Sequence, residues 1–252
     1  MSFKLARKTA IIVGASSGLG EAIAKQLGRK GWKLALVARR KEKLEELADQ
    51  IGQGPAKRPL VYAHDVTKYS EVPALFNKIV EDLGGLELFV QTAGIMPDIG
   101  PEEYDFDKDK RMVEVNLLGT IAWCNEAADL FTRLQAGTIL GVGSVAGDRG
   151  RHAMPVYGAT KGAQAIYLES LRNRLASRGV RVVTIKPGPI ATPMTEGLGN
   201  LPFMISATKA AQVSVDAALS GKSKTVYVPW RWTIIMAVIR AIPSFIFRKL
   251  KI

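Results

Sequence analysis

Short runs of apolar residues alternate with longer amphipathic stretches along most of the chain. The apolar runs are nearly continuous, which is typical of strands buried on both faces of a sheet. We predict seven such strands, at residues 9–13, 33–38, 59–63, 86–90, 137–142, 180–185 and 225–228. The stretches between them predict helices at about 18–30, 41–52, 68–83, 108–132, 155–178 and 206–220. Within 41–52, Leu44, Leu47 and Ile51 recur at helical spacing and charged residues occupy the other side.

This order of elements predicts an α/β fold. Strands that alternate with helices form a parallel sheet, so we expect a doubly wound, Rossmann-type domain with a seven-stranded parallel sheet and helices on both faces. We assign residues 1–229 to this single domain and 230–252 to a basic, apolar C-terminal tail. Ligands of such sheets bind beyond the carboxyl ends of the strands, so the functional residues should follow the strands.

Composition adds the expected setting of the protein. The chain has 252 residues, of which 47% are hydrophobic and 23% charged, as in ordinary folded proteins. Its one cysteine, Cys124, cannot form an intrachain disulfide and is expected to fill space in the core, which is typical of a reducing compartment. The first apolar run is short and is needed as a strand. We therefore predict no signal peptide and a cytoplasmic location.

The formal net charge of +12 admits a nucleic acid, an anionic cofactor or a membrane surface as partner. Lysine and arginine are scattered over the predicted helix faces, so we expect no specific binding of nucleic acid. The tail is the exception, because it combines many apolar residues with five cations and no acidic residue. The cations are Arg231, Arg240, Arg248, Lys249 and Lys251.

Three glycines follow the first predicted strand, in the stretch GASSGLG at residues 14–20. Between a strand and a helix, the first glycine permits a tight turn, the second lets the backbone approach a pyrophosphate, and the third allows close helix–strand packing. The N–H groups and the positive end of the helix then receive phosphates. We predict a dinucleotide site that includes Gly14, Ser16, Ser17, Gly18, Leu19 and Gly20. A plain tight turn is the alternative interpretation.

The end of the second strand indicates which dinucleotide binds. It reads Ala38-Arg39-Arg40, where NAD-binding units carry an acidic residue for the ribose 2′-hydroxyl. A guanidinium instead pairs bidentately with a 2′-phosphate, so we predict NADP(H), bound through Arg39 and Arg40. The alternative is a pair of solvated arginines at a helix start, which is an unfavourable place for cations.

Candidate reactive residues lie in the second half of the chain. Tyr157 and Lys161 are four residues apart, on one face of the helix predicted at 155–178. A phenol has a pKa near ~10, but a neighbouring ammonium favours the phenolate and lowers that pKa. Ser144 follows the fifth strand and could hold a substrate oxygen beside Tyr157, while Asn116 lies in the preceding long helix. In a chain without the glycine loop and Ser144, a tyrosine and a lysine at this spacing would more often be exposed surface residues with no catalytic role.

These residues belong to a series of motifs that resembles the short-chain dehydrogenase/reductase family. In order over residues 7–228, the motifs are 14–20, Asp65-Val66, Thr92-Ala93-Gly94, Asn116, Ser144, 157–161 and 187–192. The resemblance implies a catalytic set of four residues. Tyr157 would give or take a proton, Ser144 would orient the carbonyl, and Asn116 would hold a water in a proton relay. Lys161 would bind the nicotinamide ribose and lower the pKa of Tyr157.

The resemblance also implies further cofactor contacts and an oligomer. The additional cofactor-binding residues are Asp65, Val66, Ala93, Gly94, Tyr157, Lys161, Pro187, Gly188, Ile190 and Thr192. Asp65 and Val66 would contact the adenine, and residues 187–192 would embrace the nicotinamide side. The family commonly forms dimers and tetramers, so we expect a homo-oligomer. We assign no metal site.

Two motifs depart from the family's pattern. Val13 stands where the family usually has Thr, and Gln91-Thr92 replaces Asn-Asn in the motif after the fourth strand. Both changes should remove side-chain hydrogen bonds that brace the cofactor site. Neither touches the reacting atoms, so we expect activity to survive.

The segment 144–158 joins Ser144 to Tyr157 and should form a wall of the substrate site. It carries Arg149, Arg151 and His152, which form either a solvated turn or an anion-binding rim for a phosphorylated or carboxylated substrate. We expect His64 to be structural.

A closer resemblance covers residues 146–162 and 228–252. Both stretches resemble decaprenylphosphoryl 2-keto-pentose reductases and their bacterial relatives, which reduce a keto-sugar carried on a polyprenyl phosphate. The resemblance implies a lipid-linked substrate and a peripheral membrane contact through the tail. Alternatively, the tail packs on the domain or across a subunit interface, roofing the substrate site. Pro243 should break any helix in it.

Two functions from different classes remain open. The first is an NADP(H)-dependent oxidoreductase that reduces a carbonyl group, on a lipid-linked keto-sugar or on another ketone such as a small lipid or sugar. The second is a catalytically idle NADP-binding regulator of the same fold, which would not need Ser144, Tyr157 and Lys161 together. Nucleic-acid binding would rest on net charge alone.

Overall fold

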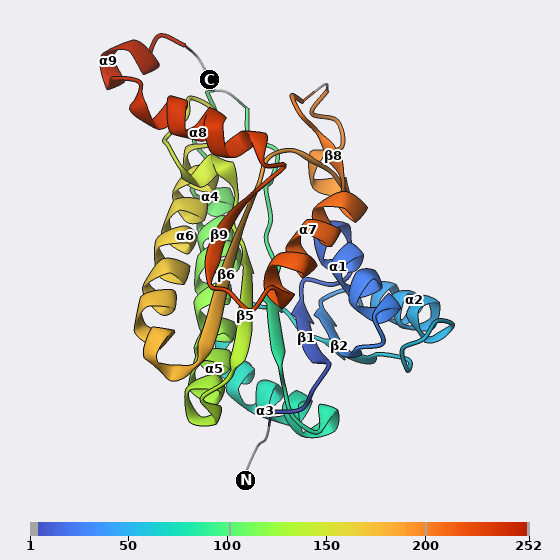
Figure 1. The fold of residues 1–252 in the computed structure, drawn as a ribbon. Helices are drawn as coiled ribbons and strands as arrows, with labels where there is room; N and C mark the ends of the chain where they lie inside the picture. The colour runs from blue at the N-terminus through green and yellow to red at the C-terminus, as the bar shows by residue number, and fades with distance from the viewer. Residues whose placement is uncertain (1–4, 101, 200, 251–252) are drawn as a thin grey trace.

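The computed structural model describes residues 5–100, 102–199 and 201–250, and across them a seven-stranded parallel sheet forms the centre (Figure 1). Its strands run in the order β3-β2-β1-β4-β5-β6-β9. They are β1 (Thr9–Val13), β2 (Lys33–Ala38), β3 (Leu60–Ala63), β4 (Leu88–Gln91), β5 (Gly137–Val142), β6 (Val180–Pro187) and β9 (Lys224–Val228). The predicted seven-stranded, doubly wound fold is confirmed, because each predicted strand has a counterpart in this sheet.

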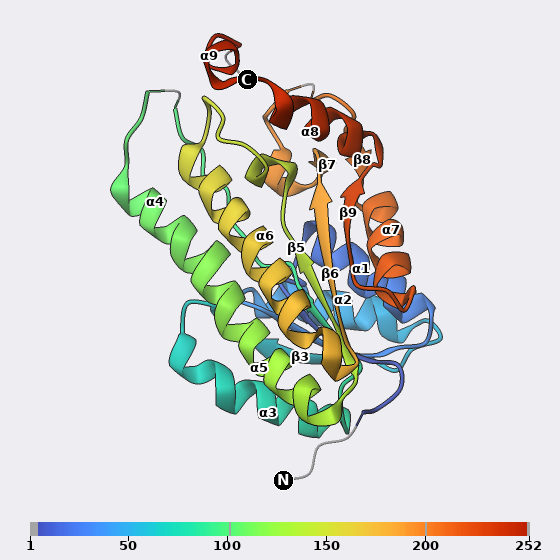
Figure 2. The same cartoon turned by 60° about the vertical axis from the view of Figure 1, so that its left-hand side comes forward.

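Helices cover both faces of the sheet (Figure 2). On one face lie α1 (Gly18–Arg29), α2 (Lys41–Gly52) and α7 (Ala207–Leu219). On the other lie α3 (Val72–Leu83), α5 (Gly119–Leu134) and α6 (Pro155–Leu175). Successive residues of a strand point to opposite faces of the sheet, so each face has its own hydrophobic core. Ile12 belongs to the first core, under α1, α2 and α7, and Ile11 to the second core, under α3, α5 and α6. Cys124 is fully buried in the second core, as predicted.

The strand order reverses at the centre of the sheet. From β1 the chain proceeds outward to β2 and β3 and then crosses to β4 on the other side of β1. The carboxyl ends of β1 and β4 therefore border the crevice in which doubly wound sheets bind ligands. The backbone tightens this junction, because Thr92 N–H donates to the Val13 carbonyl at 2.9 Å.

The long helix predicted at 108–132 is interrupted. It consists of α4 (Phe106–Met112), a π-helical segment (Val113–Leu118) and α5. A wider π turn hardly changes the spacing of apolar residues, so the sequence pattern conceals it. Such turns often accompany functional sites, and this one carries Asn116. Two short strands, β7 (Ile190–Ala191) and β8 (Ile205–Ser206), also pair beside the main sheet and are too short to predict.

The C-terminal tail leaves β9 and forms α8 (Arg231–Ala241) and α9 (Ser244–Phe247). Pro243 separates the two helices, as predicted. Helix α8 lies at the end of the sheet where the strands finish, and α9 extends outward from it (Figures 1 and 2). Lys251, one of the predicted cations of the tail, lies outside the described residues. Within the described part of the chain, no helix has the length and apolar character needed to cross a membrane.

Candidate active site

A cavity of about 560 Å³ opens at the carboxyl ends of β1, β4, β5 and β6. This volume is within the usual range for small-molecule and cofactor sites. Its wall contains all the residues predicted to contact the cofactor: Gly14, Ser16, Ser17, Gly18, Leu19, Gly20, Arg39, Arg40, Asp65, Val66, Ala93, Gly94, Tyr157, Lys161, Pro187, Gly188, Ile190 and Thr192. Ser144 also lines it, so the fold brings the two predicted groups into one space.

The glycine loop has room for a phosphate against its backbone. Gly14 has a φ of +90°, and a Cβ there would lie 2.5 Å from the Ala93 nitrogen. Ser17 precedes α1 and, among the described contacts, its side chain makes no capping hydrogen bond. The first N–H groups of α1 are therefore left for another acceptor, beside the cavity that Gly18 and Leu19 line. These features fit the pyrophosphate of a dinucleotide.

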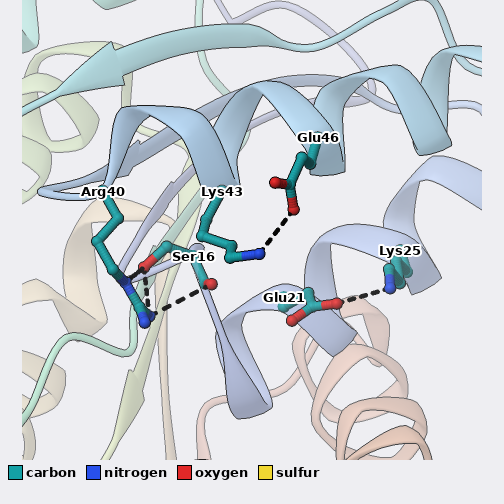
Figure 3. A network of polar contacts seen from close by, with 6 residues as sticks. All are labelled: Ser16, Glu21, Lys25, Arg40, Lys43 and Glu46. Atoms are coloured by element: carbon teal, nitrogen blue, oxygen red, sulfur yellow. Dashed lines mark hydrogen bonds and ion pairs between the residues drawn. The ribbon is translucent and has the colours of Figure 1, made fainter.

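The two arginines after β2 differ in their surroundings. Arg40 contacts the glycine loop and donates to the Ser16 hydroxyl at 3.0 Å (Figure 3). It also donates to the Ser17 hydroxyl at 2.8 Å. Arg39 is exposed and has no hydrogen-bond partner among the described residues. The nearby pairs Glu21–Lys25 and Lys43–Glu46 close within their own helices, so these carboxylates do not neutralise the arginines (Figure 3).

The reactive residues come from the loop after β5 and from α6. Ser144 ends the loop after β5, and its hydroxyl accepts from Ala146 N–H at 3.1 Å. Tyr157 and Lys161 lie in the first turns of α6, with the Lys161 ammonium 5.9 Å from the centre of the Tyr157 ring. Lys161 is buried, and its Nζ donates to the Val142 carbonyl at 3.3 Å and to Gln164 Oε1 at 3.1 Å. Serine, phenol and ammonium thus share one end of the cavity.

Burial dominates the acidity of both titratable groups. It raises the pKa of Tyr157, although a hydrogen bond with Ser144 and the positive charge of Arg151 act to lower it. Burial also lowers the pKa of Lys161 to about 8. Arg151 is thus one cation that acts to lower the pKa of Tyr157, and the lowering effect expected of Lys161 stays a prediction. Loss of water disfavours the charged form of tyrosine and lysine alike.

Asn116 lies behind the cavity wall rather than in it. Its amide is fully buried, accepts from Ile95 N–H at 2.7 Å and donates to the Ile95 carbonyl at 2.9 Å. A Cβ on Gly94 would lie 3.3 Å from Asn116 Oδ1 and 3.4 Å from Lys161 Nζ. The bare glycine therefore lets both side chains approach the segment after β4.

A buried polar network behind Lys161 was not predicted. Gln164 accepts from Lys161 and donates to Thr120 Oγ1 at 2.9 Å, and Gln91 donates to the same hydroxyl at 3.2 Å. Thr120 in turn donates to the Asn116 carbonyl at 2.7 Å. The sequence signal was available, because these are polar residues at positions that the helix and strand patterns bury.

This network also corrects the expected effect of the unusual motif. Gln91 and Thr92 do not lose the bracing hydrogen bonds. Gln91 contacts Thr120, and Thr92 Oγ1 donates to the Val13 carbonyl at 2.7 Å, joining β4 to β1. Val13 itself is apolar and fully buried in the second core.

The three basic residues of segment 144–158 separate in space. Arg149 turns away from the cavity, donates to the Ile239 and Ile242 carbonyls, and stacks on Phe247. It is neither a solvated residue nor part of an anion-binding rim. His152 is exposed and lies outside the cavity wall, whereas Arg151 lines it.

Residues 8–200 match the family model described as short chain dehydrogenase, which covers most of the chain. The protein belongs to the short-chain dehydrogenase family. Two relatives agree: an uncharacterized oxidoreductase of Staphylococcus epidermidis is 36% identical over 77% of this chain and 83% of its own. Another uncharacterized oxidoreductase, of Staphylococcus aureus, is 34% identical over 76% of this chain and 81% of its own. The short-chain dehydrogenase is therefore an oxidoreductase of a family that binds nicotinamide cofactors and acts on alcohols and carbonyls.

Solved structures share the fold of this short-chain dehydrogenase. A levodione reductase superposes with a TM-score of 0.83 at 23% identity, over 91% of this chain and 99% of that one. An alcohol dehydrogenase from the archaeon Thermococcus sibiricus, complexed with 5-hydroxy-NADP, superposes with a TM-score of 0.77 at 28% identity. The superposition covers 87% of this chain and 95% of that one.

The tail of the short-chain dehydrogenase contributes one residue to the cavity. Trp232 of α8 lines the wall and lies against Gly188, where a Cβ would collide with the indole nitrogen. Phe203, from the segment between β7 and β8, packs edge-on against the Trp232 ring, with the two ring centres 6.1 Å apart. Trp232 and Met236 are buried, so this face of the tail packs on the domain and roofs the cavity.

At the opposite end of the cavity, Asp65 follows β3. Although burial acts to raise the pKa of its carboxyl, hydrogen bonds from Thr67 and Arg111 outweigh burial and lower it. His64 is buried and meets Trp123 edge-on at 5.5 Å, a packing contact that agrees with a structural role.

Proposed function

We propose that this short-chain dehydrogenase is an NADP(H)-dependent carbonyl reductase. The proposal rests chiefly on the meeting of Ser144, Tyr157 and Lys161 in the same cavity as the glycine loop. The bound nicotinamide supplies the hydride for reduction of the carbonyl carbon.

The chain's own residues handle the oxygen. Ser144 donates a hydrogen bond that orients the carbonyl oxygen, and Tyr157 transfers its hydroxyl proton to that oxygen as the alcohol forms. Burial raises the pKa of Tyr157, so the phenol keeps its proton at neutral pH. A protonated tyrosine is the form that reduction requires, whereas alcohol oxidation requires the phenolate.

We assign the remaining catalytic roles to buried groups. Lys161, held by Gln164 and the Val142 carbonyl, would bind the nicotinamide ribose. Asn116 keeps the backbone of Ile95 in place, where the proton relay would pass.

The preference for NADP(H) is proposed from Arg39, Arg40 and Ser16. The three residues line the end of the cavity beside β2, and that strand provides no acidic residue for a ribose hydroxyl. Guanidinium and hydroxyl groups are suitable donors to a 2′-phosphate. The Thermococcus sibiricus relative, crystallised with 5-hydroxy-NADP, supports this cofactor class.

We further propose that the substrate is carried on a lipid and that the outer face of the tail contacts an anionic membrane. Four large apolar side chains of this face are strongly exposed: Trp230 (66%), Ile234 (59%), Val238 (59%) and Phe245 (62%). Exposed cations lie among them, and residues 229–250 contain no acidic residue. The cations are Arg231, Arg240, Arg248 and Lys249.

The location of this face supports a lipid surface as its partner. Met194, Leu198, Phe203 and Met204 are also exposed, in the segment whose Phe203 touches Trp232. Apolar side chains from two segments therefore surround the cavity near Trp232. An apolar face bordered by cations is typical of segments that lie in the headgroup layer of anionic bilayers.

The reductase proposal is tested by oxidation of NADPH with a panel of keto-sugars, ketosteroids and medium-chain ketones. The wild type should reduce at least one of them, and Tyr157→Phe should lower turnover at least a hundredfold while NADPH affinity changes less than threefold. A panel without turnover, together with tight NADPH binding, would instead indicate the idle cofactor-binding regulator.

A further inference from the structure

Arg151 is a cation in the cavity without a counter-ion. It lines the same wall as Ser144 and Tyr157 and is half-buried. Its Nε is completely buried and has no hydrogen-bond partner among the residues that the structure describes. A buried donor without an acceptor is unfavourable, so a residue kept in this state points to a partner supplied by a ligand.

The nearest acidic residue cannot serve as that partner. Asp148 lies three residues before Arg151, and its side chain is fully buried. Its two carboxylate oxygens already accept from Lys186 Nζ and from the Tyr227 hydroxyl, both at 2.6 Å. The Asp148–Lys186 pair is electrically neutral, and it leaves the charge of Arg151 uncompensated.

The cavity offers no other carboxylate near Arg151. Of the described residues in its wall, Asp65 alone is acidic, and it lies at the β3 end, paired with Arg111 at 3.0 Å. Because β3 and β5 are separated by three strands, Asp65 is far from the loop that follows β5. The first turn of α6 lines the cavity through Tyr157 and Gly158, and the start of a helix adds further positive potential.

The cavity wall that Arg151 shares is mostly apolar. Its large apolar residues include Val145, Met154, Met194, Leu198, Leu201 and Trp232. One guanidinium among such side chains suits a molecule that has one anionic group and an otherwise apolar body. A guanidinium binds carboxylates and phosphates bidentately, so both groups satisfy its geometry.

We propose that Arg151 binds an anionic group of the carbonyl substrate, a carboxylate or a phosphate, and thereby selects amphiphilic anionic ketones. The inference rests on the proposed reductase function of this cavity. Arg151 is then a specificity-determining residue, whereas Arg149 and His152 of the same loop have no part in substrate binding.

The test compares ketones that share one apolar chain and differ in one terminal group: a phosphate monoester, a carboxylate or a neutral methyl ester. Arg151→Gln should raise the KM for at least one anionic ketone tenfold or more and change that for the neutral ester less than twofold. Arg151→Lys should restore part of the loss, because it keeps the charge and loses the bidentate geometry. The anionic ketone whose KM rises more in Arg151→Gln carries the group that Arg151 prefers.

Arg178→Gln is the matched control. It removes the same charge from an exposed site at the far end of α6, beyond the helix's last turn, and should leave all three KM values unchanged. If Arg151→Gln raises the KM equally for the anionic and the neutral ketones, the proposal is overturned. A shift of the pH profile that accompanies equal losses would show that Arg151 acts through the acidity of Tyr157.

A binding measurement separates this inference from the reductase proposal. Calorimetry of the NADP⁺-saturated protein with the corresponding alcohols requires no turnover. Tighter binding of an anionic alcohol than of the neutral one in the wild type, abolished in Arg151→Gln, supports the anion site even if no ketone is reduced. Equal binding of the alcohols, or no binding of either, overturns it.

Discussion

The guanidinium carbon of Arg149 lies 4.0 Å from the centre of the Phe247 ring. The same guanidinium donates to the carbonyls of Ile239 and Arg240, in the last turn of α8, and to that of Ile242, which follows the helix. The last carbonyls of a helix have no partner within it, and here a side chain satisfies two of them. One residue of the loop between Ser144 and Tyr157 therefore attaches both tail helices to the domain.

We predict that Arg149→Ala loosens the tail. A hydrogen bond to a charged group contributes about 1.5–3 kcal/mol, and about 1.4 kcal/mol corresponds to a tenfold change in an equilibrium. Amide hydrogen exchange over residues 231–247 should therefore accelerate at least tenfold. Exchange in β1 and β5 should stay unchanged. Arg178→Ala, an equal loss of charge elsewhere, should have no effect, and unchanged exchange in Arg149→Ala would contradict the attachment.

A second prediction separates the two arginines after β2. Arg39 has no partner among the described residues, so Arg39→Ala should weaken NADPH about tenfold to a hundredfold and NADH less than threefold. Arg40 also holds Ser16 and Ser17, so Arg40→Ala should weaken both cofactors, NADPH more strongly. The measurement is the KM for each cofactor.

Lys43→Ala provides the control for these variants, because Lys43 lies in the first turn of α2, just after both arginines, and is paired with Glu46. It should leave the ratio of the two KM values unchanged. Equal effects of Arg39→Ala on NADPH and NADH would refute the assignment of the 2′-phosphate site.

The fold was predictable because its central strands are buried on both faces. Strands β1, β2 and β5 begin and end at the predicted residues, since a parallel sheet leaves apolar runs with abrupt ends. The π-helical segment around Asn116 was not predictable. Its geometry depends on contacts distant in sequence, such as those between Asn116 and the Ile95 backbone, which no local pattern encodes.

The candidate site was predictable wherever a residue follows a strand, since topology alone brings such residues together. The electrostatic effects on the site's titratable groups were not predictable from the sequence. Burial acts most strongly on the pKa of Tyr157 and raises it, and burial in a cavity is a property of the whole fold. Arg149 and Arg151 are two residues apart and look alike in the sequence, yet one contacts the tail and the other the cavity.

A third prediction concerns pH. The pKa of Lys161 is about 8, so the ammonium loses its proton as the pH rises through that value. If the charged form is needed to hold the ribose, kcat/KM for reduction should fall above about pH 8. Gln164 contacts the ammonium, so Gln164→Glu should raise the pKa of Lys161 and move this decline to higher pH, whereas Gln164→Leu should move it lower. A decline that stays in place in both variants would show that another group controls it.

The last prediction concerns the outer face of the tail. The wild type should co-sediment with vesicles that contain anionic phosphatidylserine at low salt and be released as salt rises, because the attraction of each cation, about 1 kcal/mol near such a surface, is screened. Replacing Arg240, Arg248 and Lys249 by Glu should abolish binding. Replacing Ile234 and Val238 by Ser should weaken it at all salt concentrations, because these side chains supply the apolar contact.

Two controls place the contact on the tail. Leu219→Ser removes an exposed apolar side chain from α7, and Arg133→Glu reverses a charge on α5; both should bind vesicles as the wild type does. Trp232 and Met236 remain untouched in every variant, so the face that packs on the cavity is preserved. A wild type that stays in solution at low salt would mean that another surface, such as a second copy of the chain, covers Trp230 and Phe245. Concentration-dependent dimerisation, lost on replacing Ile234 and Val238 by Ser, would then identify that partner.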